Sequence, residues 1–314
     1  MELPVVLPLL ILLLLWVALG QLFGLVYPFI SSLIVSMSPP SRSQFQLIYA
    51  MLPALIASMI SLLVFTPLVG GVNFSSHCHG LVCSDHVPVL QTSPLIGTGL
   101  ILFFAISVAV TVLFLAVSVW RNFRTASILC RLSSDGVGDQ YRILETKDIV
   151  ACCVGLFRTE ILISRGIVEK ASPLQLQVIL NHERAHACRL DNLRKLLVTF
   201  ATLTWSRTGR ARLLADVELA CEQGCDSVVA DLEGSAEIVT DTITLVYSWQ
   251  GSVLSSKDRE QARARLALLD GNECQDEEVW KPVAMVLSSS AALTVIAGDI
   301  LHQAAEVILT VVPY

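Results

Sequence analysis

Three long runs of apolar residues dominate the first 120 positions of the chain. They cover residues 3–30, 45–69 and 94–120, and each exceeds the roughly 20 residues with which a helix crosses about 30 Å of hydrocarbon. A weaker fourth run covers residues 282–298, and a further apolar stretch, 299–314, either extends it or lies along the membrane interface. The pattern predicts three membrane-spanning helices and, after a long interval, a fourth.

Between the third and fourth runs the pattern changes to short segments typical of a domain outside the membrane. After the turn-rich "SSDGVGDQ", the runs "YRIL", "DIVACCVG" and "TEILIS" are rich in β-branched and apolar residues. They predict a small sheet of two or three strands, closed by "RGIVEKA".

Helix signals follow this sheet. Ser172 is a good N-cap, Pro173 fits the first helical position, and Gln175 completes a capping box. Residues 174–205 contain no proline or glycine and predict one long helix or two helices with a bend. Further helices are predicted over residues 210–232, 236–249 and, as a charged surface helix, 257–270.

Charge divides the chain at the same places. Residues 1–120 carry three formal charges, and most of the others lie in 121–281. Arginines 121, 124 and 131 follow the third run, whereas the loop 70–93 has no lysine or arginine, so the positive-inside rule puts the N-terminus and this loop outside. A cleaved signal peptide would begin with positive charge, but only Glu2 precedes the first run, and we expect an uncleaved span.

These patterns predict an α-helical, multi-pass protein of the cell (inner) membrane with an inserted α+β domain. We expect three transmembrane helices with a short external loop in 1–120, a cytoplasmic domain in 121–281, and a fourth transmembrane helix with the C-terminal end in 282–314. The lipid bilayer is thus one partner. The net charge of −6 gives no support to direct nucleic-acid binding.

Nine cysteines fit this topology. Seven lie in the predicted cytoplasmic domain, where thiols stay reduced. Cys78 and Cys83 lie in the external loop and could form a disulfide, while His77, His79 and His86 beside them match no standard metal spacing.

The strongest chemical signal is "HERAH" within the predicted helix 174–205. On a helix, His182 and His186 share one face and can offer two imidazoles to one ion. Glu183 lies about 100° around the helix, where it can contact a water on the metal and accept its proton. A short match of this kind also occurs by chance. The zinc interpretation therefore depends on the predicted helix around the motif and on finding a third ligand.

Carboxylates from the following helix are the candidates for that third ligand. Glu218, Glu222 and Asp226 recur at i, i+4 spacing and share a face, and spacing alone does not choose among them. An acidic stripe is often only a solvated face. Asp191 and Asp226 are candidates to hold the histidine rings from outside the ligand set.

"HERAHACRLDN" followed by "ELACEQGCD" resembles the BlaR/MecR family of membrane-embedded zinc metallopeptidases and is more distantly similar to the HtpX-type proteases. The resemblance implies one zinc ion per chain and a gluzincin-like domain, a small sheet with an H-E-x-x-H helix and a glutamate helix. It implies that Glu222 is the third ligand and that Cys225 packs beside the site.

The resemblance also implies how a substrate binds. The strand "EILIS" would be an edge that pairs with an extended substrate, and "RARLALLD" is similar to a late family helix. The chain shows "TWSRTGR" where the family has a tryptophan- and proline-containing turn, and no S-x-x-K occurs, so β-lactam sensing is not expected. The residues of the strand "EILIS" that would pair with the substrate are Glu160, Ile161, Leu162, Ile163 and Ser164.

We therefore expect an integral-membrane zinc endopeptidase in which His182, His186 and Glu222 bind zinc and Glu183 is the general base. Its substrate by resemblance is a cytoplasmic protein such as a transcriptional repressor, or the protease itself, in signal transduction. Nothing singles out the group that stabilises the oxyanion among Tyr247 and arginines 184 and 189, and a homodimer stays open. The alternative is a non-catalytic membrane receptor with a structural zinc domain. A transporter is disfavoured because the spans have almost no ionisable residues.

Overall fold

A computed structural model of the chain describes residues 6–65, 76–79, 82–85, 94–136, 140–251 and 255–271, with scattered positions between 284 and 300. The predicted fourth span and the stretch 299–314 therefore lie largely outside the described residues. Of the loop 70–93, which was predicted to be external, the structure describes only the backbone of a short hairpin, β1 (Ser76–His79) with β2 (Val82–Asp85). The side chains considered above for a disulfide or a metal site lie outside the described part of the structure; they are Cys78, Cys83, His77, His79 and His86.

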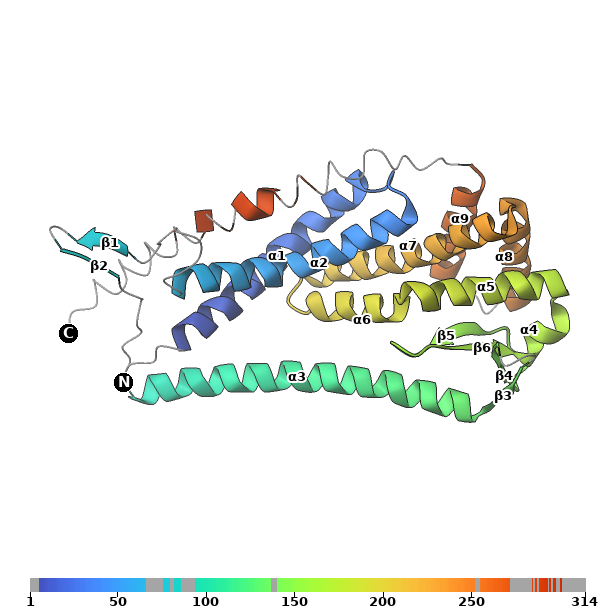
Figure 1. Cartoon of the computed structure of the whole chain (residues 1–314), viewed down its shortest axis with the longest axis horizontal. Helices are drawn as coiled ribbons and strands as arrows, with labels where there is room; N and C mark the ends of the chain where they lie inside the picture. Colours follow the sequence, from blue (N-terminus) through green and yellow to red (C-terminus); the bar gives the residue numbers. More distant parts are fainter. Residues whose placement is uncertain are drawn as a thin grey trace.

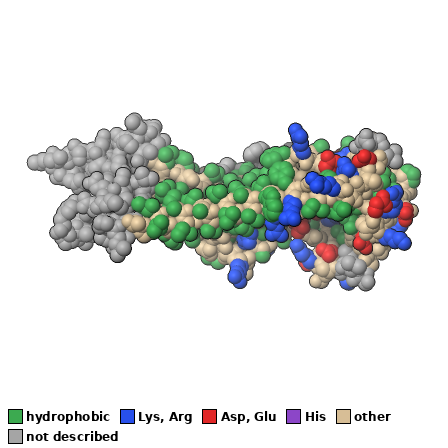
Figure 2. Space-filling view, turned by 90° about the horizontal axis from the view of Figure 1, so that it is seen from below, with side chains coloured by type: hydrophobic (Ala, Val, Ile, Leu, Met, Phe, Trp, Pro, Cys, Tyr) green, Lys and Arg blue, Asp and Glu red, His purple; other side chains and the backbone are tan. Residues whose placement is uncertain are grey.

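Three of the described helices are long and apolar enough to cross a membrane. They are α1 (Val6–Leu33), α2 (Pro39–Phe65) and α3 (Pro94–Arg131). Figure 2 shows hydrophobic side chains over the middle of the molecule, whereas charged side chains gather at the end that carries the sheet. The most hydrophobic window of α3 has no buried residue, and lipid would cover such a surface at no cost in free energy. α3 continues without a break past residue 120, where the membrane part was predicted to end and the cytoplasmic domain to begin.

The sheet has four strands rather than the predicted two or three. They are β3 (Ser133–Asp135), β4 (Arg142–Leu144), β5 (Ala151–Val154) and β6 (Glu160–Ser164), in the order β3-β4-β6-β5. β3 comes from the segment predicted to be a turn, and its residues "SSD" pair antiparallel with β4.

This strand order corrects the predicted substrate edge. β6, which contains Glu160 to Ser164, pairs with β4 on one side and with β5 on the other, so its backbone groups are already bonded within the sheet. The edge strand beside the helices is β5. The family resemblance implied that β6 is an edge, but the antiparallel pairing of β5 with β6 makes β5 the outermost strand on this side.

Two helices form where one or two were predicted. Behind the short α4 (Arg165–Lys170), the capping box of Ser172 and Gln175 starts α5 (Pro173–Arg189), and α6 (Asp191–Ala201) follows. They are separated by Leu190, whose φ of 54° is the one positive value among described non-glycine residues. A left-handed residue ends a helix, and the chain restarts at once in a new direction.

The long helix α7 (Arg207–Glu233) joins the apolar helices to the rest of the domain. Leu213, Val217 and Cys221 in its first half pack in one core with residues of α1 and α2. Val229 in its second half packs with α5 and with α8 (Ala236–Gln250). α9 (Ser256–Leu269) lies across α7 and α8 (Figure 1).

The first turn of α7 touches α1 backbone to backbone. A Cβ built on Gly209 would lie 2.0 Å from the carbonyl oxygen of Gly24. No side chain can fit there unless one helix moves, so these glycines set the distance between α1 and the helix that carries half of the candidate site.

Gly209→Ala should therefore lower the thermal stability of the protein in detergent, by about 1–3 kcal/mol as is usual for overpacking. The control is Gly99→Ala on α3, where nothing lies within 4 Å of the added Cβ and alanine favours the helix. Equal melting temperatures for the two variants would contradict the close packing.

Candidate active site

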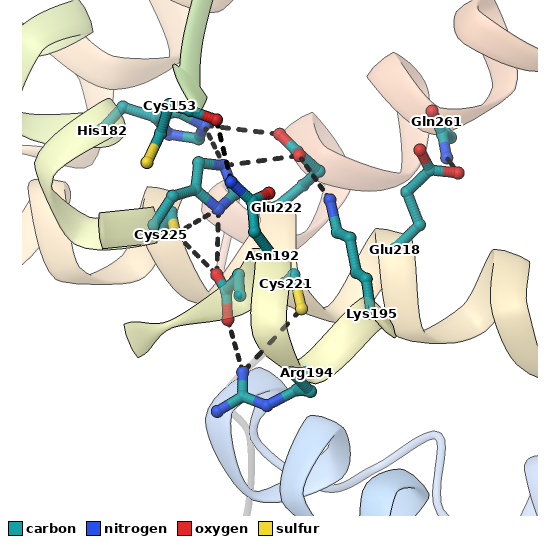
Figure 3. A network of polar contacts seen from close by, with 12 residues as sticks. Cys153, His182, Asn192, Arg194, Lys195, Glu218, Cys221, Glu222, Cys225 and Gln261 are labelled. Carbon is teal, nitrogen blue, oxygen red and sulfur yellow. Dashed lines mark hydrogen bonds and ion pairs between the residues drawn. The ribbon is translucent and has the colours of Figure 1, made fainter. Parts of the chain in front are cut away.

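The two histidines of the H-E-x-x-H sequence lie one turn apart on α5 and direct the same ring atom to one point. The Nε2 atoms of His182 and His186 are 3.2 Å apart. Glu222 reaches this point from α7, with Oε2 3.3 Å from Nε2 of His182 and Oε1 3.4 Å from Nε2 of His186 (Figure 3).

These separations suit one tetrahedral ion. Ligand atoms bound about 2.0–2.1 Å from a tetrahedral zinc lie about 3.3 Å from one another, which is the spacing in this structure. Two imidazole nitrogens and a carboxylate oxygen are also donors that zinc accepts. The His182, His186 and Glu222 group therefore fits a zinc ion in both geometry and chemistry.

Each histidine is held through its other ring nitrogen. Nδ1 of His182 lies 3.0 Å from Oδ1 of Asp226, and Nδ1 of His186 lies 2.9 Å from Oδ2 of Asp191. A carboxylate at Nδ1 makes that nitrogen the hydrogen-bond donor and leaves the Nε2 lone pair for a metal. The break at Leu190 is what returns the Asp191 carboxylate toward His186.

Arg265 of α9 supports the same group and was not among the predicted site residues. Its Nε and Nη2 each donate to Asp226 at 2.7 Å, and its Nη1 lies 3.2 Å from Oε2 of Glu222. α9 was predicted as a surface helix because of its many charges. Ala262, Leu266 and Leu269 nevertheless pack inward, and their 3–4 spacing could have placed Arg265 on the buried face.

The charges around the site shift its pKa values in opposite directions. Burial by itself lowers the pKa of His182, but its hydrogen bonds to Asp226 and Glu222 outweigh burial and raise the pKa to about 10. The hydrogen bonds from both histidines hold the pKa of Glu222 well below its usual range despite burial. Burial raises the pKa of Glu183, although both histidines oppose the shift.

Glu183 and the three candidate ligands line a cavity of about 830 Å³. The edge strand β5 borders it, and apolar residues of α5, α7 and α8, among them Val178, Val229 and Ile243, form another wall. A cavity of this size admits several residues of an extended peptide.

Cys225 lies beside the site but differs from the three candidate ligands. Its Sγ is 3.3 Å from Nδ1 of His186 and 3.5 Å from Asp191, so these three residues form a second group of metal-binding types. Burial raises the pKa of the Cys225 thiol. The second group would have to bind a metal through Nδ1 of His186, which already bonds Asp191, and Asp191 also accepts from Arg194. The first group, whose three ligand atoms have no such partner in common, therefore fits zinc better.

Other residues that were candidates for the site lie away from the point where His182, His186 and Glu222 meet. Glu218, one turn before Glu222, accepts a hydrogen bond from Lys257 and another from Gln261 (Figure 3). Arg184 bonds Asn181 and Gln140 outside the cavity, and Arg189 lies against Asp191. Tyr247 lines the cavity.

Two imidazoles and a carboxylate that converge beside helices apolar enough to cross a membrane form a site suited to a metal-dependent, membrane-associated hydrolase. A model of peptidase family M48 matches residues 97–254, just over half of the chain, and the chain therefore belongs to this family of zinc metallopeptidases. No curated protein and no solved structure matches it. The match begins in α3 and ends after α8, so α1, α2 and α9 lie outside it.

The shifted pKa of His182 predicts that zinc displaces a proton. Near pH 7 the metal-free protein holds His182 protonated, because its pKa is about 10, whereas zinc binds the neutral ring. At pH values below this pKa, the apparent zinc affinity should increase about tenfold for each unit by which the pH rises, per proton displaced. The protonated ring stabilises the metal-free fold below about pH 6.5, the ordinary histidine value, and this contribution is lost as pH rises through about 10.

Titration calorimetry of zinc binding in two buffers of different ionisation enthalpy measures the proton release. We expect different binding enthalpies in the two buffers at pH 7. Identical enthalpies would mean that no proton leaves and would contradict the charged His182.

Proposed function

We propose that the protein is a multi-pass membrane zinc endopeptidase in which His182, His186 and Glu222 hold the metal and Glu183 is the general base. The observation that carries this proposal is the 3.2–3.4 Å spacing of the three ligand groups on two helices. When bound, zinc supplies a Lewis acid and a water of lowered pKa.

Glu183 moves the proton. Its carboxylate is buried in the cavity beside both histidines, and its raised pKa brings the group closer to the range in which it both accepts and returns a proton. It accepts a proton from the attacking water and passes that proton to the amine that leaves when the peptide bond breaks. Asp191 and Asp226 keep the imidazoles oriented throughout.

The edge strand β5 is our candidate for substrate alignment. The amide of Ser164 in β6 donates to the carbonyl oxygen of Val150. In this antiparallel register, the backbone groups of residues 150, 152 and 154 therefore point toward β6. The backbone groups of Ala151 and Cys153 therefore face the helices, where the Cys153 carbonyl accepts from Asn192. A peptide pairing with the remaining groups would lie extended across the cavity.

We place this domain, residues 121–281, in the cytoplasm of a cell with the N-terminus outside. The arginines 121, 124 and 131 at the end of α3 support this orientation. The resemblance to the BlaR/MecR family supports a substrate such as a cytoplasmic repressor, or the protease itself, and a role in signal transduction.

Glu183→Gln should remove at least about 100-fold of the peptidase activity, the usual minimum for a general base, while the bound zinc is unchanged. Activity is measured by comparing membrane and cytoplasmic proteins of cells that express either form, and zinc by elemental analysis of the purified protein. An unchanged cellular response with zinc bound would instead support the non-catalytic receptor.

The third ligand has a matched control on the same helix. Glu222→Gln should abolish stoichiometric zinc binding, because it removes one anionic ligand, whereas Glu218→Gln, one turn earlier and bonded to Lys257 and Gln261, should leave zinc binding unchanged. Zinc retained by Glu222→Gln and lost by Glu218→Gln would overturn the ligand assignment.

A further inference from the structure

The first turn of α2 touches the supports of both halves of the candidate zinc site. Arg42 and Ser43 are consecutive residues near the start of this helix. Arg42 donates through Nη2 to Oε1 of Gln223, and Ser43 accepts from Nη2 of Arg189 at 3.4 Å. Ser43 is completely buried and Gln223 is 5% exposed, so these contacts lie inside the protein.

The contact of Arg42 leads to Glu222 and Asp226. Gln223 follows Glu222 on α7 and donates through Nε2 to the carbonyl oxygen of Ala264 at 2.8 Å. Ala264 precedes Arg265, whose guanidinium holds both Glu222 and Asp226. Gln223 thus joins the start of α2 to the part of α9 that orients the carboxylates.

The contact of Ser43 leads to His186. Arg189 lies 3.4 Å from Asp191, and Asp191 holds Nδ1 of His186. The guanidinium of Arg189 fits between α2 and α7 because residue 224 is glycine. A Cβ on Gly224 would lie 2.7 Å from Nη2 of Arg189.

α1 joins the same unit. The hydroxyl of Tyr27 donates to Asp216 of α7 at 2.9 Å and accepts from Gln46 of α2 at 3.2 Å. The helix pair α1–α2 is therefore bonded to α7 at two levels, at Asp216 and at Gln223.

We infer that Arg42 and Ser43 are positioning residues of the metal site, so that a shift of the α1–α2 pair against α7 changes how tightly the site holds zinc. The inference rests on the proposed function. It assigns part of the support of the site to helices outside the family match, and it gives the membrane helices a direct means of regulating the peptidase.

The test measures metal binding, independent of activity. Each variant is made in the full chain carrying Glu183→Gln, which prevents self-cleavage. Zinc affinity is measured by competition with a chromophoric chelator, and the ligand geometry by the visible absorption of the Co²⁺-loaded protein. The variants are Arg42→Met, Arg42→Lys, Ser43→Ala and the double change Arg42→Met with Ser43→Ala. Arg207→Met, an exposed arginine in the first turn of α7, is the control.

We expect the double variant to bind zinc about tenfold more weakly, the lower end of the 10–100-fold loss seen when groups behind metal ligands are removed. The single variants should lose less, Arg42→Lys should recover most of the loss because an ammonium still donates to Gln223, and the cobalt spectrum should shift. Arg207→Met should match its parent. Affinity and spectrum of the double variant equal to those of Arg207→Met would overturn the inference.

A second variant keeps the test informative if changes in α2 disturb folding. Gly224→Ala leaves α2 intact and favours the helix, and the atoms nearest to its added Cβ are those of the Arg189 guanidinium. It should weaken zinc binding and shift the cobalt spectrum in the same way, and no change in either would count against the Ser43 branch. A parent protein that binds no zinc would overturn the proposed function itself, and this inference with it.

Discussion

Three largely buried carboxylates surround the two imidazoles of the site, and the need to balance their charge fixes how the neighbouring helices pack. Asp191 and Asp226 have side chains that are 1% exposed, and Glu222 lies between the histidines. A buried ion without a partner costs several kcal/mol, so the site needs cations from several elements. Arg189 and Arg194 accompany Asp191, while Arg265 accompanies Asp226 and Glu222. The helices α5, α6, α7 and α9 are held together by this balance.

The long α7 is the element that serves both the site and the apolar helices. Its first half packs against α1 and α2, its middle carries Glu222 and Asp226, and its second half packs on α8. A rigid helix with these contacts cannot shift at one end while its other end stays in place. The backbone contact at Gly209 and the hydrogen bonds at Asp216 and Gln223 therefore bear on the same two carboxylates.

Local patterns predicted much of this arrangement. Helix periodicity and the capping box placed His182, Glu183 and His186 on one helix, and three apolar runs gave three helices long enough to span a membrane. Long-range choices were not predictable in this way. The outermost position of β5 follows from strand pairing, and the break at Leu190 needs a left-handed leucine that no local rule favours. The role of Arg265 was not predicted because its partners Asp226 and Glu222 lie on another helix, and even the nearer one, Asp226, is 39 residues earlier in the chain.

X-ray absorption at the zinc edge of the purified protein identifies the atoms that bind the metal. We expect two imidazole nitrogens and carboxylate oxygen at about 2.0–2.2 Å, with no sulfur, because His182, His186 and Glu222 supply the ligands. A sulfur neighbour at about 2.3 Å would assign the metal to Cys225 with His186 and Asp191 instead, and the peptidase geometry derived from the first group would be wrong.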